Sequence, residues 1–200
     1  MTSHLAELLK QSSARHSHLC PRQVLGVRMG LAGLKALGIE APIKKQIGLV
    51  IVETDGCFAD GVQVATGAAV GHRTLRVHDL GKIAATIVNV QTGQAIRFSP
   101  QPDVRERAVF YAPDLKSRYS IQLHGYQSMP EGELLRFQKV SLQPSLAEII
   151  SKPNVRVKCS GCGEEIFNER QVKVGNAVLC RACAGMGYYR LQDALPAAKP

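Results

Sequence analysis

The sequence contains no tryptophan, and aromatic residues make up only 5% of its 200 positions. The sequence therefore has few residues for a surface that stacks nucleic-acid bases on aromatic rings. Blocks of basic residues are also missing: the formal net charge is +9, yet Lys44 and Lys45 form the only basic doublet. We interpret this charge as a solvated surface and expect weak or no binding to nucleic acid.

Long hydrophobic runs are absent as well. The most apolar run, residues 47 to 52, is too short to span a bilayer. The first ten residues alternate polar and apolar positions in the spacing of a helix, without the continuous apolar core of a signal peptide. We therefore expect no membrane partner and place the protein in the cytoplasm, where thiols bind metals rather than each other.

Cysteines are few, but four of the six form two Cys-x-x-Cys pairs with seventeen residues between them. The four are Cys159, Cys162, Cys180 and Cys183. Two such pairs complete a tetrahedral thiolate site, so we predict a bound zinc ion. Because four sulfurs fill the coordination sphere, this zinc is expected to hold structure rather than to do chemistry. Two disulfides are the alternative, and they require a secreted chain.

The pattern around these cysteines predicts a small zinc ribbon. Gly161 and Gly163 lie where a knuckle needs a positive φ, and residues 172 to 179 are typical of a hairpin leading into the second pair. We place this ribbon domain at residues 154–192, after a linker at 146–153, and expect a disordered tail at 193–200.

Residues 1–145 are predicted to form the main domain. Their helical and strand patterns follow one another irregularly, which favours an α+β fold with a mixed or antiparallel sheet packed with helices. Repeated βαβ units are not indicated. Helices are expected at residues 3–11, 21–37, 57–69, 102–112 and 114–124, and strands at 46–54, 75–79, 83–91, 94–98 and 134–142.

The other two cysteines share one local setting. Cys20 precedes Pro21, which is favoured at the first position of a helix, so Cys20 is expected at the N-cap. Cys57 follows Asp55 and Gly56, which end a strand, and opens the next helix. The positive end of a helix dipole lowers the pKa of a thiol, so thiolates that bind metal or attack an electrophile are predicted here.

Two histidines and a carboxylate complete this candidate site. His16, His18 and Cys20 fall at every second position, and an extended segment would point all three in one direction. Together with Cys57 they suit zinc or another divalent metal as a second, core site. Asp60 is a candidate fourth ligand, proton acceptor or partner that orients a histidine. The alternatives are cysteines packed in the core and histidines on the surface.

Two further motifs need weighing. Three glycines, Gly26, Gly30 and Gly33, have helical spacing, but the sequence signatures of a phosphate-binding loop are missing. We therefore predict close packing of this helix against the sheet or another helix. Residues 79 to 82 are typical of a tight turn, and Lys82 is a candidate for binding an anionic cofactor.

These residues resemble the FmdE family, named for a component of formylmethanofuran dehydrogenase, over residues 10 to 145. The matching blocks are residues 16–21 and 25–29, residues 53–57 with Asp60, Gln63, Thr66 and Gly67, and Gly71 with residues 79–82. The four-cysteine segment is similar to the TraR-type finger often appended to this family. One departure is Arg22, because the family commonly has glycine after the Cys-Pro pair.

The resemblance implies an α+β core that pairs as a homodimer, with His18, Cys20 and Cys57 lining a metal-binding or active site. It also implies a link to molybdenum or tungsten enzymes and hence a metalloenzyme partner. Three hypotheses stay open: a metal-binding accessory protein, a small-molecule enzyme that uses a metal hydroxide or one of the candidates Cys20, Cys57 and Asp60, and a zinc-ribbon regulator that binds nucleic acid.

Overall fold

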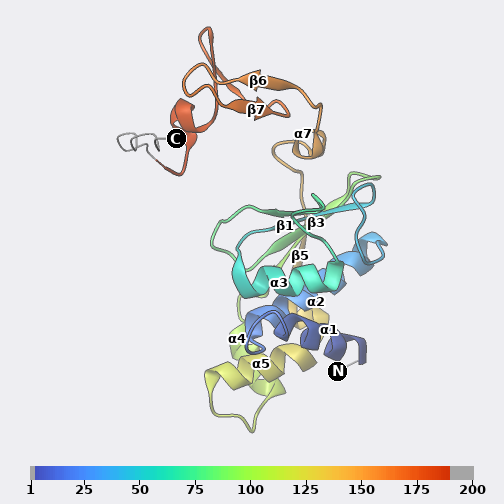
Figure 1. The fold of residues 1–200 in the computed structure, drawn as a ribbon. Helices are drawn as coiled ribbons and strands as arrows, with labels where there is room; N and C mark the ends of the chain where they lie inside the picture. Colours follow the sequence, from blue (N-terminus) through green and yellow to red (C-terminus); the bar gives the residue numbers. More distant parts are fainter. Residues whose placement is uncertain (1–2, 190–200) are drawn as a thin grey trace. The chain divides into compact units, whose positions relative to one another are not determined.

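The structure, a computed structural model, describes residues 3–189. It divides into two compact units, Met1–Gln143 and Pro144–Pro200. The predicted tail at 193–200 and the last residues of the predicted ribbon lie outside the described residues. The α+β prediction is confirmed, with a five-stranded mixed sheet and helices in the first unit (Figure 1).

The sheet of the first unit has the strand order β2-β1-β3-β4-β5. Strand β1 pairs in parallel with β2 and in antiparallel with β3, and the remaining pairs are antiparallel. The connection from β1 through α3 to β2 is the one parallel crossover of this sheet. The strands are β1 (Gly48–Val52), β2 (Leu75–Val77), β3 (Ala85–Asn89), β4 (Ala95–Pro100) and β5 (Leu135–Lys139).

Helices pack on one side of this sheet, and α2 among them contacts β3 and β4 directly (Figure 1). Helix α2 (Pro21–Leu37) is buried along most of its length and contacts α1 (Ser3–Ser13), α3 (Gly56–Thr66) and α5 (Arg118–Ser128). It begins and ends as the sequence predicts, with Cys20 at the N-cap and Gly38 in the left-handed conformation at the C-cap.

The contact between α2 and α3 is unusually close, and two glycines make it so. A Cβ atom on Gly26 would lie 2.3 Å from the carbonyl oxygen of Phe58, and one on Gly61 would lie 2.4 Å from that of Gln23. No side chain fits at either position while the helices keep this separation. The predicted role of the glycine series in close packing is confirmed.

Residues 102 to 124 differ from the prediction. Helix α4 (Val104–Arg107) continues into the 3₁₀ turn η1 (Ala108–Tyr111), and α5 begins at Arg118 rather than at residue 114. Pro113 disfavours helical geometry in the residue before it, and Ser117 caps the later start by accepting a hydrogen bond from the Ser120 N–H at 3.0 Å. The short helix α6 (Glu131–Leu134) then leads into β5.

The second unit contains two small hairpins. Strands β6 (Arg156–Lys158) and β7 (Glu165–Phe167) flank the first cysteine pair, and β8 (Val172–Val174) and β9 (Ala177–Leu179) precede the second. The predicted hairpin at 172–179 is therefore confirmed. The segment predicted as a linker contains the short helix α7 (Leu146–Ile150), and the helical turn η2 (Ala182–Met186) follows β9. No helix among residues 3–189 is long and apolar enough to cross a membrane.

The close helix contact yields a first prediction. Gly26→Ala places a methyl group against the backbone of α3, so the helices must separate, and we expect a loss of about 3 kcal/mol in the free energy of unfolding. Urea denaturation, followed by circular dichroism, measures this loss in the free energy of unfolding. Gly132→Ala is the matched control, because nothing lies within 4 Å of its added Cβ. Equal stability of the two variants would contradict the role of Gly26.

Candidate functional site

A cavity of about 730 Å³ opens in the first unit where α2 and α3 begin. Its floor and walls come from α2, α3, α4, α5 and the segment between β2 and β3. Apolar side chains, among them Leu25 and Ile83, form part of the wall. The side chains that give the cavity its chemistry are Cys20, Arg22, Cys57, Lys82, Arg105, Glu106, Tyr119 and Gln122.

Cys20 is held in place by a buried glutamine. The backbone N–H of Cys20 donates a hydrogen bond to Gln23 Oε1 at 2.7 Å, and Gln23 Nε2 donates to the carbonyl of Ser12 at 2.9 Å. Gln23 is fully buried, so both halves of its amide need these partners. The start of α2 is thereby tied to the end of α1, and the thiol of Cys20 is fixed at the edge of the cavity.

Cys57 lies in the first turn of α3 and lines the same cavity as Cys20. Burial raises the pKa of the Cys57 thiol, and the neighbouring Cys20 side chain raises that pKa further. The predicted lowering of the Cys57 pKa by the helix dipole is therefore wrong. Backbone hydrogen bonding at the helix start does act in the predicted direction, but it is weaker than burial.

Lys82 is brought to this cavity by a well-ordered turn. The carbonyl of Glu53 at the end of β1 accepts hydrogen bonds from the N–H groups of Leu80 and Lys82, at 2.9 and 3.1 Å. Asp79 Oδ1 accepts a third from Gly81, at 2.9 Å. The turn predicted from the sequence is present, and it places the Lys82 side chain on the wall that also contains the two thiols.

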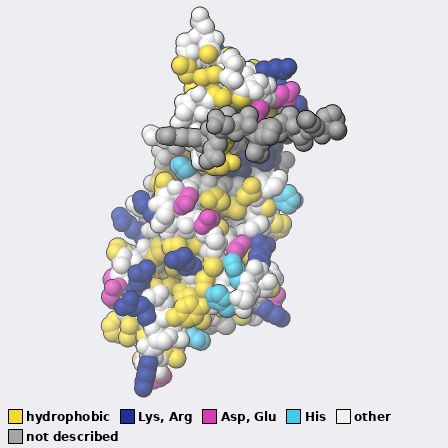
Figure 2. All heavy atoms as spheres, turned by 60° about the vertical axis from the view of Figure 1, so that its left-hand side comes forward, with side chains coloured by type: hydrophobic (Ala, Val, Ile, Leu, Met, Phe, Trp, Pro, Cys, Tyr) yellow, Lys and Arg dark blue, Asp and Glu magenta, His cyan; other side chains and the backbone are white. Residues whose placement is uncertain are grey.

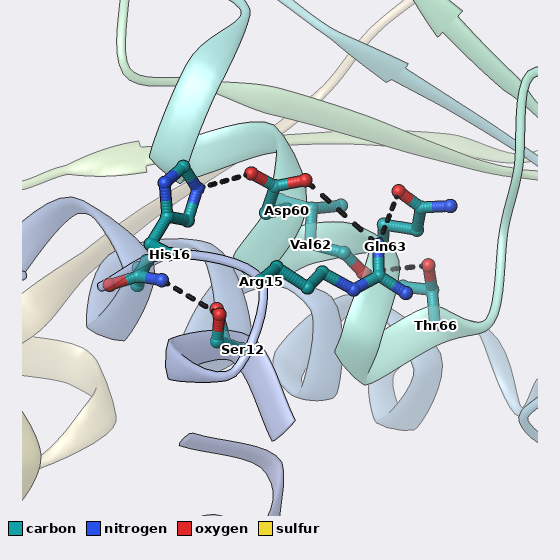
Figure 3. Close-up of polar contacts among 8 residues, drawn as sticks. Ser12, Arg15, His16, Asp60, Val62, Gln63 and Thr66 are labelled. Atoms are coloured by element: carbon teal, nitrogen blue, oxygen red, sulfur yellow. Dashed lines mark hydrogen bonds and ion pairs between the residues drawn. The ribbon is translucent and has the colours of Figure 1, made fainter. Parts of the chain in front are cut away.

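His16 and Asp60 form a pair beside the cavity. Figure 3 shows Arg15 and His16, from the segment after α1, pointing toward Asp60 and Gln63 on α3. His16 Nε2 lies 2.5 Å from Asp60 Oδ2, and Arg15 donates to Gln63 Oε1 at 2.8 Å. Asp60 therefore orients a histidine, one of the roles predicted for it, and its own carboxylate contributes to raising the pKa of Cys57.

His18 takes a different position from the one expected. Residues 14 to 18 form turns rather than the predicted extended segment, because several of their backbone N–H groups bond to carbonyls three or four residues earlier. The His18 side chain is exposed, with Nδ1 3.2 Å from Ser17 Oγ. Its convergence with Cys20 and Cys57 on one ion, with or without His16, stays a prediction.

Several cavity residues were not found from the sequence. Arg105, Tyr119 and Gln122 come from α4 and α5, which reach the cavity only through the packing of α5 against α2. The Tyr119 hydroxyl donates a hydrogen bond to the carbonyl of Leu19 at 2.8 Å, directly before Cys20. No spacing or motif in the sequence links these positions to the cysteines.

The four remaining cysteines form a cluster in the second unit. Their sulfur atoms all lie within 4.8 Å of one another, and those of Cys162 and Cys180 are 4.0 Å apart. A tetrahedral zinc site with bonds of about 2.3 Å separates its sulfurs by about 3.8 Å. Among residues 3–189, no other group of three or more histidine, cysteine or carboxylate side chains is gathered so closely.

The surroundings of this cluster suit thiolates around a cation. Hydrogen bonds from backbone N–H groups, chiefly those of Cys162 and Cys180, lower the pKa of Cys159 to about 6. Side-chain hydrogen bonds with the neighbouring cysteines, Cys180 first, raise the pKa of Cys183 to about 12, because they hold the proton on its thiol. Gly163 has the predicted positive φ, 78°, while Gly161 does not. The donor set fits a structural zinc ion.

Comparison with known proteins identifies the family. The family model described as FmdE, molybdenum formylmethanofuran dehydrogenase operon, matches residues 15–136. The chain belongs to the FmdE family. The resemblance found in the sequence is thus confirmed. The model of the prokaryotic dksA/traR C4-type zinc finger matches residues 153–185, which include the four clustered cysteines. The chain is therefore a metal-binding FmdE-like protein with a four-cysteine site.

Two relatives extend this comparison. A probable S-adenosyl-L-methionine-binding protein from Archaeoglobus fulgidus is 32% identical over 208 residues, covering 93% of this chain and 55% of the relative. The chain thus spans about half the length of that curated relative. The crystal structure of a tungsten formylmethanofuran dehydrogenase FmdE-like protein from Syntrophus aciditrophicus shares the fold. It has a TM-score of 0.59 and 21% identity, over 93% of this chain and 95% of that one.

The cluster yields a second prediction. Cys180→Ser should release the zinc and leave the residues after about 153 sensitive to protease, while the first unit stays folded. Zinc contributes on the order of 10 kcal/mol to the folding of such small modules. Limited proteolysis with mass spectrometry and metal analysis measures both effects. The control Cys57→Ser removes a thiol from the first unit and should leave the second unit protected; retained zinc and protection in Cys180→Ser would refute the assignment.

Proposed function

We propose that this protein is a metal-binding accessory protein linked to molybdenum or tungsten enzyme systems. The cavity in its first unit binds a second divalent metal, or a small molecule that carries a metal. The zinc of the second unit is structural. The protein works in the cytoplasm as a homodimer alongside a metalloenzyme partner. The link to molybdenum rests on the description of the family alone.

One observation carries this proposal: two cysteines from separate helices face the same open cavity. Cys20 at the start of α2 and Cys57 at the start of α3 are 37 positions apart in the chain, yet their side chains interact. Two thiols from separate helix starts, with room beside them, are suited to a metal that keeps an open coordination position. Around this cavity the chain provides two sulfur ligands, a histidine (His16) that Asp60 orients, and basic side chains in the wall.

An enzyme that uses a free thiolate is less well supported. A nucleophilic cysteine needs a lowered pKa, whereas burial and the neighbouring Cys20 raise that of Cys57. A cation bound between the two sulfurs would remove this conflict, because it stabilises both thiolates. The same pair of residues therefore fits metal binding better than covalent catalysis.

Metal analysis tests the proposal. Native protein should contain about two metals per chain, one in each unit, and the double variant Cys20→Ala, Cys57→Ala should contain one. His18→Ala should also lower the occupancy of the second metal if His18 completes the site. His124→Ala is its matched control, because His124 is another exposed histidine of the first unit. One metal in both native protein and the double variant would refute the core site.

The relative from Archaeoglobus fulgidus favours a second candidate, binding of S-adenosyl-L-methionine in the same cavity. The name of that relative gives this activity, and the volume and partly apolar wall of the cavity suit a molecule of that kind. Calorimetric titration with S-adenosyl-L-methionine should then show binding that Leu25→Arg, which fills the cavity, abolishes. The absence of heat with native protein at millimolar ligand would exclude this candidate.

A further inference from the structure

A second cavity, of about 360 Å³, adjoins the one that contains the thiols. The two cavities share three wall residues: Arg105, Glu106 and Gln122. Lys116 and Arg118, at the start of α5, line the second cavity alone. We call the two together the basic groove. One end of it holds Cys20 and Cys57, and the other end lies against the first turn of α5.

The basic groove is strongly cationic. Five of its lining side chains are basic, and Glu106 is its single acid. The five are Arg22, Lys82, Arg105, Lys116 and Arg118. None of them forms an ion pair with a carboxylate anywhere in residues 3–189. Figure 2 shows lysine and arginine side chains gathered around apolar surface in the lower half of that view.

All five cations are exposed to solvent, and an anion that enters the groove is attracted by several of them at once. Three carboxylates of the first unit pair with cations outside the groove: Glu53 with Arg97, Asp60 with His16, and Asp103 with Arg107. Glu106 is therefore the one carboxylate available inside the groove to offset its charge. The guanidinium group of an arginine and the free backbone N–H groups in the first turn of a helix both bind phosphate oxygens well. Arg118 combines the two, because it is the first residue of α5.

The other end of the groove offers a surface for a ring. The Tyr119 side chain is about half exposed, and its hydroxyl is fixed by the Leu19 carbonyl, so its position is set before a ligand arrives. Leu25, Ile83 and Val104 add apolar wall. A ring that packs on Tyr119 lies on the way from the phosphate end to the two thiols.

We propose that the basic groove binds a small molecule that carries both a phosphate and a planar ring, with the phosphate at Arg105, Lys116 and Arg118. The ring packs at Tyr119, and the remainder reaches Cys20 and Cys57. This inference rests on the proposed function, because it names the ligand class of the same cavity. It adds an anion subsite that a metal ion alone does not need.

Isothermal titration calorimetry of the full zinc-loaded chain with inorganic pyrophosphate tests the anion subsite. The double variant Lys116→Ala, Arg118→Ala should weaken binding at least tenfold, since it removes two cations at the start of α5. The matched control Lys44→Ala, Lys45→Ala removes the same charge from an exposed pair that does not line the groove. It should change the affinity less than twofold. Equal losses in both double variants, or no binding at millimolar pyrophosphate, would overturn the proposal.

Adenosine 5′-diphosphate tests the ring end in the same assay. Tyr119→Leu should weaken its binding at least fivefold and leave pyrophosphate binding unchanged, whereas Tyr119→Phe should keep most of the affinity for both. Equal affinities of native protein and Tyr119→Leu for the nucleotide would overturn the ring assignment. Tighter binding of a single-stranded oligonucleotide than of either probe would overturn the proposal in favour of nucleic acid.

The pyrophosphate assay is independent of the metal assay. Suppose that the double cysteine variant (Cys20→Ala, Cys57→Ala) contains one metal fewer than native protein, and that native protein binds no pyrophosphate. The metal proposal then stands and the phosphate proposal fails. If the double cysteine variant and native protein bind pyrophosphate alike and contain the same metal, the phosphate subsite stands and the core metal site fails.

Discussion

The close contact of α2 with α3 is the constraint on which the first unit depends. Gly26 and Gly61 let the two backbones meet directly, and Gly30 continues the contact against Ala65 and Thr66, so the helices lie alongside each other. This packing brings the starts of both helices, and with them Cys20 and Cys57, to the same cavity. The sheet positions α3 through the crossover from β1 to β2, and α2 then follows from the glycine contact. The candidate site is a consequence of helix packing more than of loop geometry.

The two thiol sites of this protein differ in how the chain prepares them. In the second unit, backbone N–H groups point at Cys159 and lower its pKa to about 6, so the cluster is ready for a cation. In the first unit, burial works against ionisation of Cys57. The four sulfurs of the second unit fill the coordination sphere of an ion. The two sulfurs of the first unit lie beside a wide cavity and leave room for a ligand. This difference supports the proposed roles, which are structural for the four-cysteine cluster and ligand-binding for the cavity.

Much of the fold could be predicted from the sequence, because its signals are local. Pro21 and Gly38 mark the ends of α2, and the two cysteine pairs mark the metal cluster with its hairpin. The far wall of the cavity could not be predicted. Arg105 and Tyr119 reach it through tertiary packing, and Asp60, the partner of His16, comes from a helix more than forty positions away in the chain.

Gln23 imposes a chemical requirement that its shape alone does not reveal. Its amide must accept a hydrogen bond from the Cys20 backbone N–H and donate one to the Ser12 carbonyl, and it is buried away from water. A glutamate of nearly equal size cannot do both as a carboxylate, because its second oxygen would face the carbonyl oxygen of Ser12. The link through Gln23 between the Cys20 backbone and α1 therefore contains no ionisable group, so a change of pH does not act on this link directly.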